Sequence, residues 1–341
     1  MFSASATSRG AARTGTTMMG YARYIGRVGG LAVALGIGAG VAVMPWAASA
    51  TPSDSHSSSS SAPAASSHVT QKKISSPRRT LLKLNISISI NGVVKVQKGT
   101  AIAVSDAGSS AIAFGAYSVA QAGGAPGVDG GAGNKATAKG NFSSASAFGS
   151  NNTATANGVN SNATATGSKN TATANGVNSI ADASQGSDNT ASNNTATATG
   201  VNSHAVAGNG SNNTATATGD GSAAFAIYGD NNKATAKGVN STAVANVNSY
   251  SVDPSVGSNN TATVNGDGST ATAGVGNNNA ATVNGDGSTA TATGDSNTAT
   301  VNGNGSDLLV LGSDNTATTN GNGIGPILVG PPCNGCTVVV P

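Results

Sequence analysis

Residues 149–184 read GSNNTATAN, GVNSNATAT, GSKNTATAN and GVNSIADAS, which are four consecutive units of nine residues. Each unit begins with Gly, has Asn or Ser at its fourth position, and has a small apolar residue, mostly Ala, at its sixth and eighth positions. The same unit, sometimes one residue longer, continues over residues 131–323. A repeat this short can bury an apolar side only against neighbouring repeats, so the sequence predicts a solenoid.

The alternation of Thr with Ala at positions five to eight is typical of a short β-strand, because side chains two apart share one face. We expect Ala inside and Thr outside. The fourth position alternates between Asn and Ser along the chain, so two units form one coil of 18–19 residues. The predicted fold is therefore all-β, a parallel β-solenoid or β-roll with two short strands per coil. An Asn ladder is expected along one corner and a Ser ladder along the other, with stacked amides bonding to the coils above and below.

Residues 81–130 precede the regular repeats and are expected to form a hairpin cap followed by a transition. From Leu82 to Ile90 apolar and polar residues alternate strictly, which indicates a half-buried strand with the apolar side chains on one face. Asn91 and Gly92 then give a strong signal for a tight hairpin turn, and residues 93–96 return. Such a hairpin would cover a sheet edge that otherwise invites aggregation.

The amino-terminal segment, residues 1–50, is expected to be a signal peptide. Four arginines precede an uncharged stretch at residues 28–43, and the small residues Ala48 and Ala50 suggest cleavage before Thr51. An uncleaved membrane anchor is the alternative. Residues 51–80 are rich in Ser, Ala and Pro and are expected to be a disordered linker. The chain is therefore expected in the cell envelope or outside the cell, with no membrane span after signal cleavage.

Charge argues against several classes of partner. Aromatic residues make up 3% and charged residues 9% of the chain, and every acidic residue is Asp. Without the leader, the net charge falls from +3 to near −1. No basic stripe or stacking platform indicates nucleic-acid binding. Lys72, Lys73, Arg78 and Arg79 either contact an anionic envelope polymer or form a solvated spacer.

No pattern predicts catalysis, a metal site or a cofactor. The three histidines are His56, His68 and His204, and none has the spacing of a catalytic arrangement. Cys333 and Cys336 form a CxxC within the tail at residues 324–341, where an exported chain favours a small disulfide loop over redox chemistry. The corner Asp residues suit turns, so the fold is not expected to need calcium.

The outward threonines are the candidate contact face. They occupy the fifth and seventh positions of the Asn-type units, where Lys135, Lys233 and Ala280 interrupt them, whereas the Ser-type units vary. β-propensity alone also favours Thr there. An alternative function is ligand binding by the Thr array, of the kind that binds ice. The face comprises Thr153, Thr155, Thr171, Thr173, Thr195, Thr197, Thr214, Thr216, Thr261, Thr263, Thr298, Thr300, Thr316 and Thr318.

Three resemblances follow from these residues. The unit G-x-x-[NS]-x-A-x-A-x over residues 131–320 resembles the head repeat of trimeric autotransporter adhesins, although that repeat is two residues shorter. The resemblance implies a surface-displayed β-roll that adheres to a host or to a neighbouring cell. We expect a structural or adhesive role, in which the long flat faces meet such a partner or other copies. The leader at residues 21–43 is similar to leaders of exported mycobacterial proteins. The coil also resembles the calcium-binding RTX β-roll, but Ala stands where that family has a ligating Asp.

Overall fold

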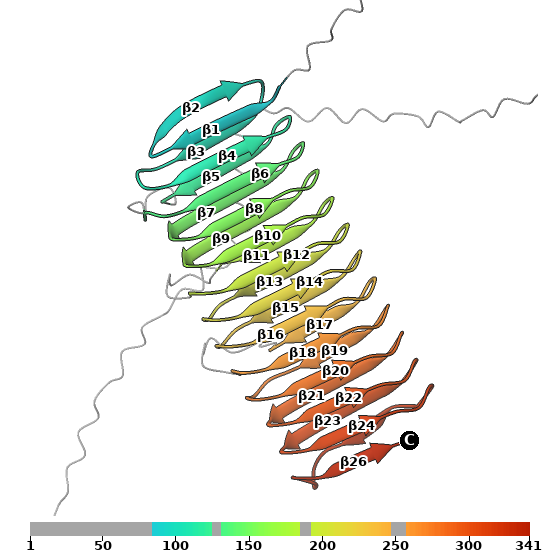
Figure 1. Ribbon diagram of the computed structural model, residues 1–341. Coiled ribbons are helices and arrows are strands. Elements are labelled where there is room, and N and C mark those ends of the chain that lie inside the picture. The colour runs from blue at the N-terminus through green and yellow to red at the C-terminus, as the bar shows by residue number, and fades with distance from the viewer. Residues whose placement is uncertain (1–83, 125–130, 185–191, 247–256) are drawn as a thin grey trace, which may run out of the picture. The chain divides into compact units, whose positions relative to one another are not determined.

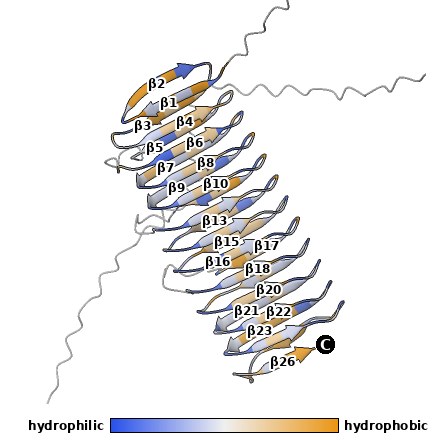
Figure 2. Cartoon of the chain, viewed as in Figure 1, coloured by the Kyte–Doolittle hydropathy of each residue, from blue (hydrophilic) through white to orange (hydrophobic). Residues whose placement is uncertain are grey.

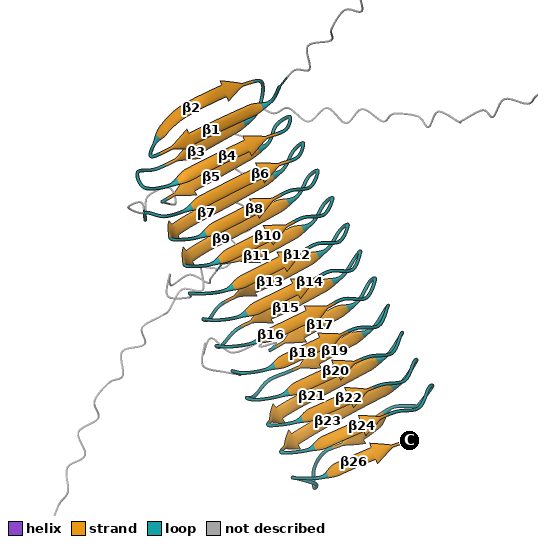
Figure 3. Cartoon of the chain, in the orientation of Figure 1, coloured by secondary structure: helices purple, strands orange, loops and turns teal. Residues whose placement is uncertain are grey.

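The computed structural model describes residues 84–124, 131–184, 192–246 and 257–341 (Figure 1). Over these ranges the chain is all-β and forms a parallel β-solenoid of about 11 turns, with successive turns about 19 residues apart. Strands alternate with loops along the described chain, as Figure 3 shows. The expected leader at residues 1–50 and the expected linker at residues 51–80 lie outside the described residues.

The coils build two sheets. The larger sheet has 14 strands, in the spatial order β2 (Val93–Lys98), β1 (Ile86–Ile90), β4 (Ser110–Phe114), β6 (Lys135–Lys139), β8 (Thr153–Ala156), β10 (Thr171–Ala174), β12 (Thr195–Ala198), β14 (Thr214–Ala217), β16 (Lys233–Ala236), β18 (Thr261–Val264), β20 (Ala280–Val283), β22 (Thr298–Val301), β24 (Thr316–Thr319) and β26 (Thr337–Val340). From β4 onward neighbouring strands of this sheet are parallel, whereas β1 pairs antiparallel with both β2 and β4.

The smaller sheet has 12 strands, all from the alternate half-coils. In spatial order they are β25 (Ile327–Val329), β23 (Asp307–Ser313), β21 (Thr289–Asp295), β19 (Thr270–Ala273), β17 (Thr242–Ala245), β15 (Ala223–Ile227), β13 (His204–Gly208), β11 (Ile180–Ala183), β9 (Asn162–Ser168), β7 (Ser144–Ser150), β5 (Val119–Gly123) and β3 (Ile102–Ser105). Each coil therefore contributes one strand to each sheet, as the two-unit repeat predicts.

The interior between the sheets consists almost entirely of Ala. Ala154 and Ala156 are fully buried, and the same positions are buried in coil after coil, which confirms the expected inside face. Val264, Val283 and Val301 replace Ala near the carboxyl end and are also fully buried. Figure 2 accordingly shows muted hydropathy along most of the stack and strongly hydrophobic colour on β2 and β26. Because a methyl group contributes only about 0.8 kcal/mol on burial, hydrogen bonds between coils must carry much of the stability.

The amino-terminal hairpin is present, but its buried face is the polar one. Ser87 and Ser89 are buried, whereas Ile90 is 41% exposed. The reason is that β3 is the last strand of the smaller sheet, so its free edge has no neighbouring strand within the described chain to accept its backbone N–H groups. The Ser87 hydroxyl accepts a hydrogen bond from the backbone N–H of Ala103 at 2.9 Å, and the Ser89 hydroxyl accepts one from Ser105 at 3.1 Å. The Ile side chains of β1 lie on the opposite, outward side, where Ile86 and Ile88 are partly buried and Ile90 is exposed.

The solenoid is longer than the expected range of 131–323. In the segment before it, Ala103 of β3 pairs in register with Ala120 of β5. In the expected tail, Thr337 of β26 pairs with Thr316 of β24. Pairing requires only alternating inward and outward side chains, so segments that lack the full Gly-Asn unit still join the sheets. Residues 125–130, 185–191 and 247–256 lie outside the described residues.

Candidate functional site

The outward face of the 14-stranded sheet is held in register by a buried Asn ladder. Asn213 shows one rung: its Oδ1 accepts the backbone N–H of Asn232 in the next coil at 2.9 Å, and its Nδ2 donates to the carbonyl of Gly229 at 2.9 Å. In every ladder residue before Asn315, Oδ1 accepts the backbone N–H of the next ladder residue. The ladder comprises ten fully or almost fully buried residues: Asn134, Asn152, Asn170, Asn194, Asn213, Asn232, Asn260, Asn279, Asn297 and Asn315. The expected ladder is present, but its bonds run from side chain to backbone rather than from amide to amide.

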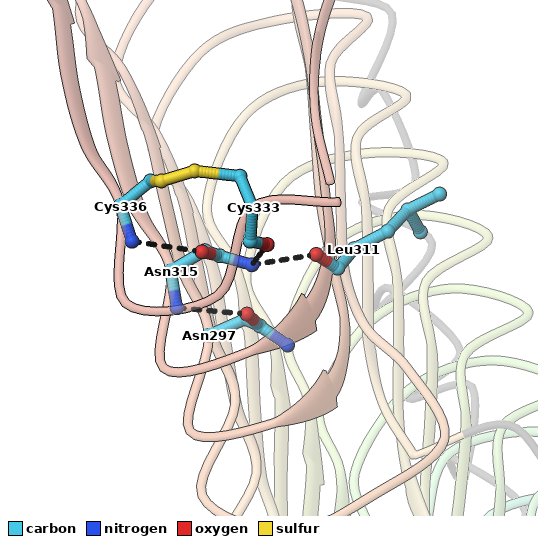
Figure 4. The surroundings of a disulfide bond; sticks show 5 residues. All are labelled: Asn297, Leu311, Asn315, Cys333 and Cys336. Carbon is cyan, nitrogen blue, oxygen red and sulfur yellow. Dashed lines mark hydrogen bonds between the residues drawn. A yellow bond between two sulfur atoms is a disulfide. The ribbon is translucent and has the colours of Figure 1, made fainter. Parts of the chain in front are cut away.

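A disulfide between Cys333 and Cys336 lies where the Asn ladder ends (Figure 4). The Oδ1 of Asn315 accepts the N–H of Cys336 at 3.0 Å, and its Nδ2 donates to the carbonyl of Cys333 at 3.3 Å. The backbone of the CxxC loop thus takes the place of the next Asn-type corner. The spacing of the cysteines indicated a disulfide, but nothing in it indicated this role.

The Ser ladder is buried as expected and uses two bonding patterns. The Ser161 hydroxyl donates to the Gly158 carbonyl of its own turn at 2.8 Å, whereas the Ser269 hydroxyl donates to Gly285 of the next coil at 2.7 Å. The corner Asp residues also join coils: Oδ1 of Asp267 accepts the backbone N–H of Val239 at 2.7 Å. This bond gives the corner Asp a structural role beyond the turn preference that the sequence suggested.

A second, exposed Asn ladder borders the threonines. At the ninth position, Asn284 accepts a hydrogen bond from Asn265 at 2.8 Å and donates one to Asn302 at 2.8 Å, in each case between side-chain amides. The same bond joins Asn157 to Asn175. The recurrence of Asn at position nine of these units was a signal for this ladder, and sequence reasoning missed it.

All fourteen predicted threonines lie on the 14-stranded sheet, half-buried and pointing outward. Registers between neighbouring strands align them into two columns that run along the stack, as in Thr171↔Thr195↔Thr214. Lys135, Lys233 and Ala280 interrupt only the fifth-position column. The seventh-position column is unbroken over ten strands and adds three residues that the predicted set omitted: Thr137, Thr235 and Thr282.

The opposite face, on the 12-stranded sheet, is irregular. His204 and Phe225 on adjacent strands meet edge to face with ring centroids 5.3 Å apart. Burial raises the pKa of the Asp182 carboxyl, although bonds to Ser184 and the charge of His204 oppose the shift. Burial also lowers the pKa of His204, against the attraction of Asp182. Oδ1 of Asp182 is buried without a hydrogen-bond partner, so this carboxyl group destabilises the face and does not form a binding site with His204.

Within the described ranges, no three His, Cys, Asp or Glu side chains gather closely enough to hold a metal ion. The same residues include no helix with the length and hydropathy needed to cross a bilayer. The two sheets, their ladders and the regular face define the chain as a β-solenoid repeat protein. No known protein family, curated protein or solved structure matches it.

Proposed function

We propose that this chain is a structural or adhesive β-solenoid repeat protein of the cell envelope or extracellular space, without catalytic activity, that engages its partner through the 14-stranded sheet. The observation that carries the proposal is the seventh-position Thr column, which is unbroken across ten strands. Side chains fixed on a paired sheet lose little conformational entropy on binding, which favours attachment through many weak contacts. The partner would be an envelope polymer, a host or neighbouring-cell surface, or another copy.

An attachment assay tests this face. Beads coated with purified protein should be retained on envelope fragments, and substituting both Thr197 and Thr216 with Glu should reduce retention, because two bulky negative charges would stand on the flat column. Thr291→Glu is the control, since Thr291 is also half-buried and outward but lies on the 12-stranded sheet. Equal retention of the double variant and the wild type would refute the contact face.

The location of the protein is tested separately. Fractionation of cells producing the native chain should recover it from the envelope or the culture fluid, with Thr51 as its first residue. Recovery of abundant protein with residues 1–50 still attached would contradict export by signal cleavage.

Binding to ice or ordered water is the second candidate function. The aligned Thr columns favour it, because they repeat hydroxyl and methyl groups at the strand spacing of about 4.8 Å. Purified protein should then show thermal hysteresis that Thr214→Lys together with Thr216→Lys removes without unfolding the chain. If wild-type protein shows no hysteresis, this candidate is excluded and the adhesive role is unaffected.

A further inference from the structure

Positive and negative charges are segregated between the two sheet faces. Among the described strands, outward positions of the 14-stranded sheet carry no Asp, and those of the 12-stranded sheet carry no Lys. The exposed lysines of the larger sheet are Lys95, Lys98, Lys135, Lys139, Lys233 and Lys237, the last directly following β16. The smaller sheet instead presents Asp182, Asp295 and Asp307. The Thr face is therefore basic on a chain whose predicted mature form is slightly acidic.

The lysines are arranged in lines along the stack. Lys135 and Lys139 stand on β6, four residues apart, which corresponds to about 13 Å. Lys233 and Lys237 repeat this pair at β16, and five strand steps separate the two pairs, about 24 Å. Lys98 lies in the same line along the stack as Lys139 and Lys237. The strand register shows this, because it pairs Lys139 with Phe114, Phe114 with Ile86, and Ile86 with Lys98.

The groups between the lysine pairs are uncharged hydrogen-bonding groups. Strands β8 to β14 present Thr at both outward positions, and Asn157 and Asn175 stand in line with Lys139 and Lys237. From β6 to β24 the outward positions hold no aromatic side chain on which nucleotide bases could stack. A second copy placed face to face would bring lysines against lysines. The charges and hydroxyls instead fit a linear polymer that has both carboxylates and sugar hydroxyls.

We propose that the outward face of the 14-stranded sheet binds an acidic polysaccharide lying along the solenoid axis, with its carboxylates at Lys135, Lys139, Lys233 and Lys237. This inference rests on the contact face proposed above and names the chemistry of its partner. Each Lys acts as a point charge on an exposed surface, so the affinity is spread over several contacts and weakens as salt screens them.

Calorimetry of the full chain with polygalacturonate at low ionic strength tests the proposal. The repeat itself supplies fold-compatible substitutions: Lys135→Thr and Lys233→Thr restore the residue typical of position five, and Lys139→Asn and Lys237→Asn restore that of position nine. The quadruple variant should bind about tenfold or more weakly, because four exposed ion pairs are lost. Lys169→Asn is the control, since Lys169 lies at a corner with φ of 56°, a conformation that Asn adopts in equivalent turns.

Four outcomes would overturn the proposal: no binding by the wild type, an unchanged quadruple variant, an equal effect of Lys169→Asn, or equally tight binding of neutral dextran. Tighter binding of a single-stranded poly-dT oligonucleotide than of polygalacturonate would assign the face to nucleic acid instead. Retention of beads on envelope fragments that depends on Thr197 and Thr216, together with no polygalacturonate binding, would overturn this proposal and leave the contact face standing.

Discussion

Replacing Asn213 with Ala removes one rung of the buried Asn ladder in the middle of the stack. The substitution leaves the backbone N–H of Asn232 without its acceptor at 2.9 Å and the carbonyl of Gly229 without its donor at 2.9 Å. Asn213 is fully buried, so water does not readily replace either bond. Each unsatisfied buried group costs about 1–3 kcal/mol, so we expect the free energy of unfolding to fall by about 2–6 kcal/mol.

The assay is urea denaturation followed by circular dichroism, together with hydrogen exchange at the Asn232 amide, which should lose its protection. Asn284→Ala is the matched control, because Asn284 also accepts one bond and donates another, but from an exposed ladder where water can substitute. That variant should stay within about 0.5 kcal/mol of the wild type. If both variants lost the same free energy, the buried ladder would not be what stabilises the stack.

Three further predictions concern single positions. Gly176→Ala should lower the melting temperature sharply, because the added Cβ would lie 2.0 Å from the Gly200 carbonyl oxygen. Gly287→Asn should nearly preserve the melting temperature, since Gly287 has open space around it and Asn takes the same positive φ in equivalent turns. Similar melting temperatures for the two variants would contradict this prediction. Thr319→Val should raise the free energy of unfolding by about 1–2 kcal/mol in urea titrations, because the buried Thr319 hydroxyl has no partner; a loss would contradict the assignment. Asp182→Thr should stabilise the protein at pH 7, because burial raises the pKa of the carboxyl and the charged form therefore destabilises the fold. Protonation of Asp182 removes this destabilisation, so the gain should shrink as the pH falls toward the ordinary Asp value of 3.8. Urea midpoints at pH 7 and pH 4 measure the gain, and a gain that did not change with pH would refute the reasoning.

The repeat body was predictable because its burial pattern is local. Alternation with period two decides which side of a strand faces inward, so Ala at positions six and eight identified the interior without any knowledge of the fold. The hairpin failed this reasoning. Its buried side depends on β3, whose N–H groups bond to the hydroxyls of Ser87 and Ser89. That contact is not visible in the alternating residues themselves.

The candidate face was predictable in part. The Thr positions followed from the unit, but Thr137, Thr235 and Thr282 escaped because Lys or Ala replaces the first Thr of their units. The lysine lines escaped for another reason: Lys135 and Lys233 share a column only because five strand steps of equal register place them there. Likewise, only the folded chain shows that the CxxC loop meets Asn315.

Strand register survives large changes in the length of chain between coils. Asn170 and Asn194 form a normal ladder bond across 24 residues, and Asn232 and Asn260 do so across 28, although most rungs span 18 or 19. The extra chain in these two intervals therefore leaves the pairing of the flanking strands unchanged. The Thr columns cross both intervals without a shift, as Thr173↔Thr197 and Thr235↔Thr263 show, so the regular face is continuous even where the sequence repeat is not.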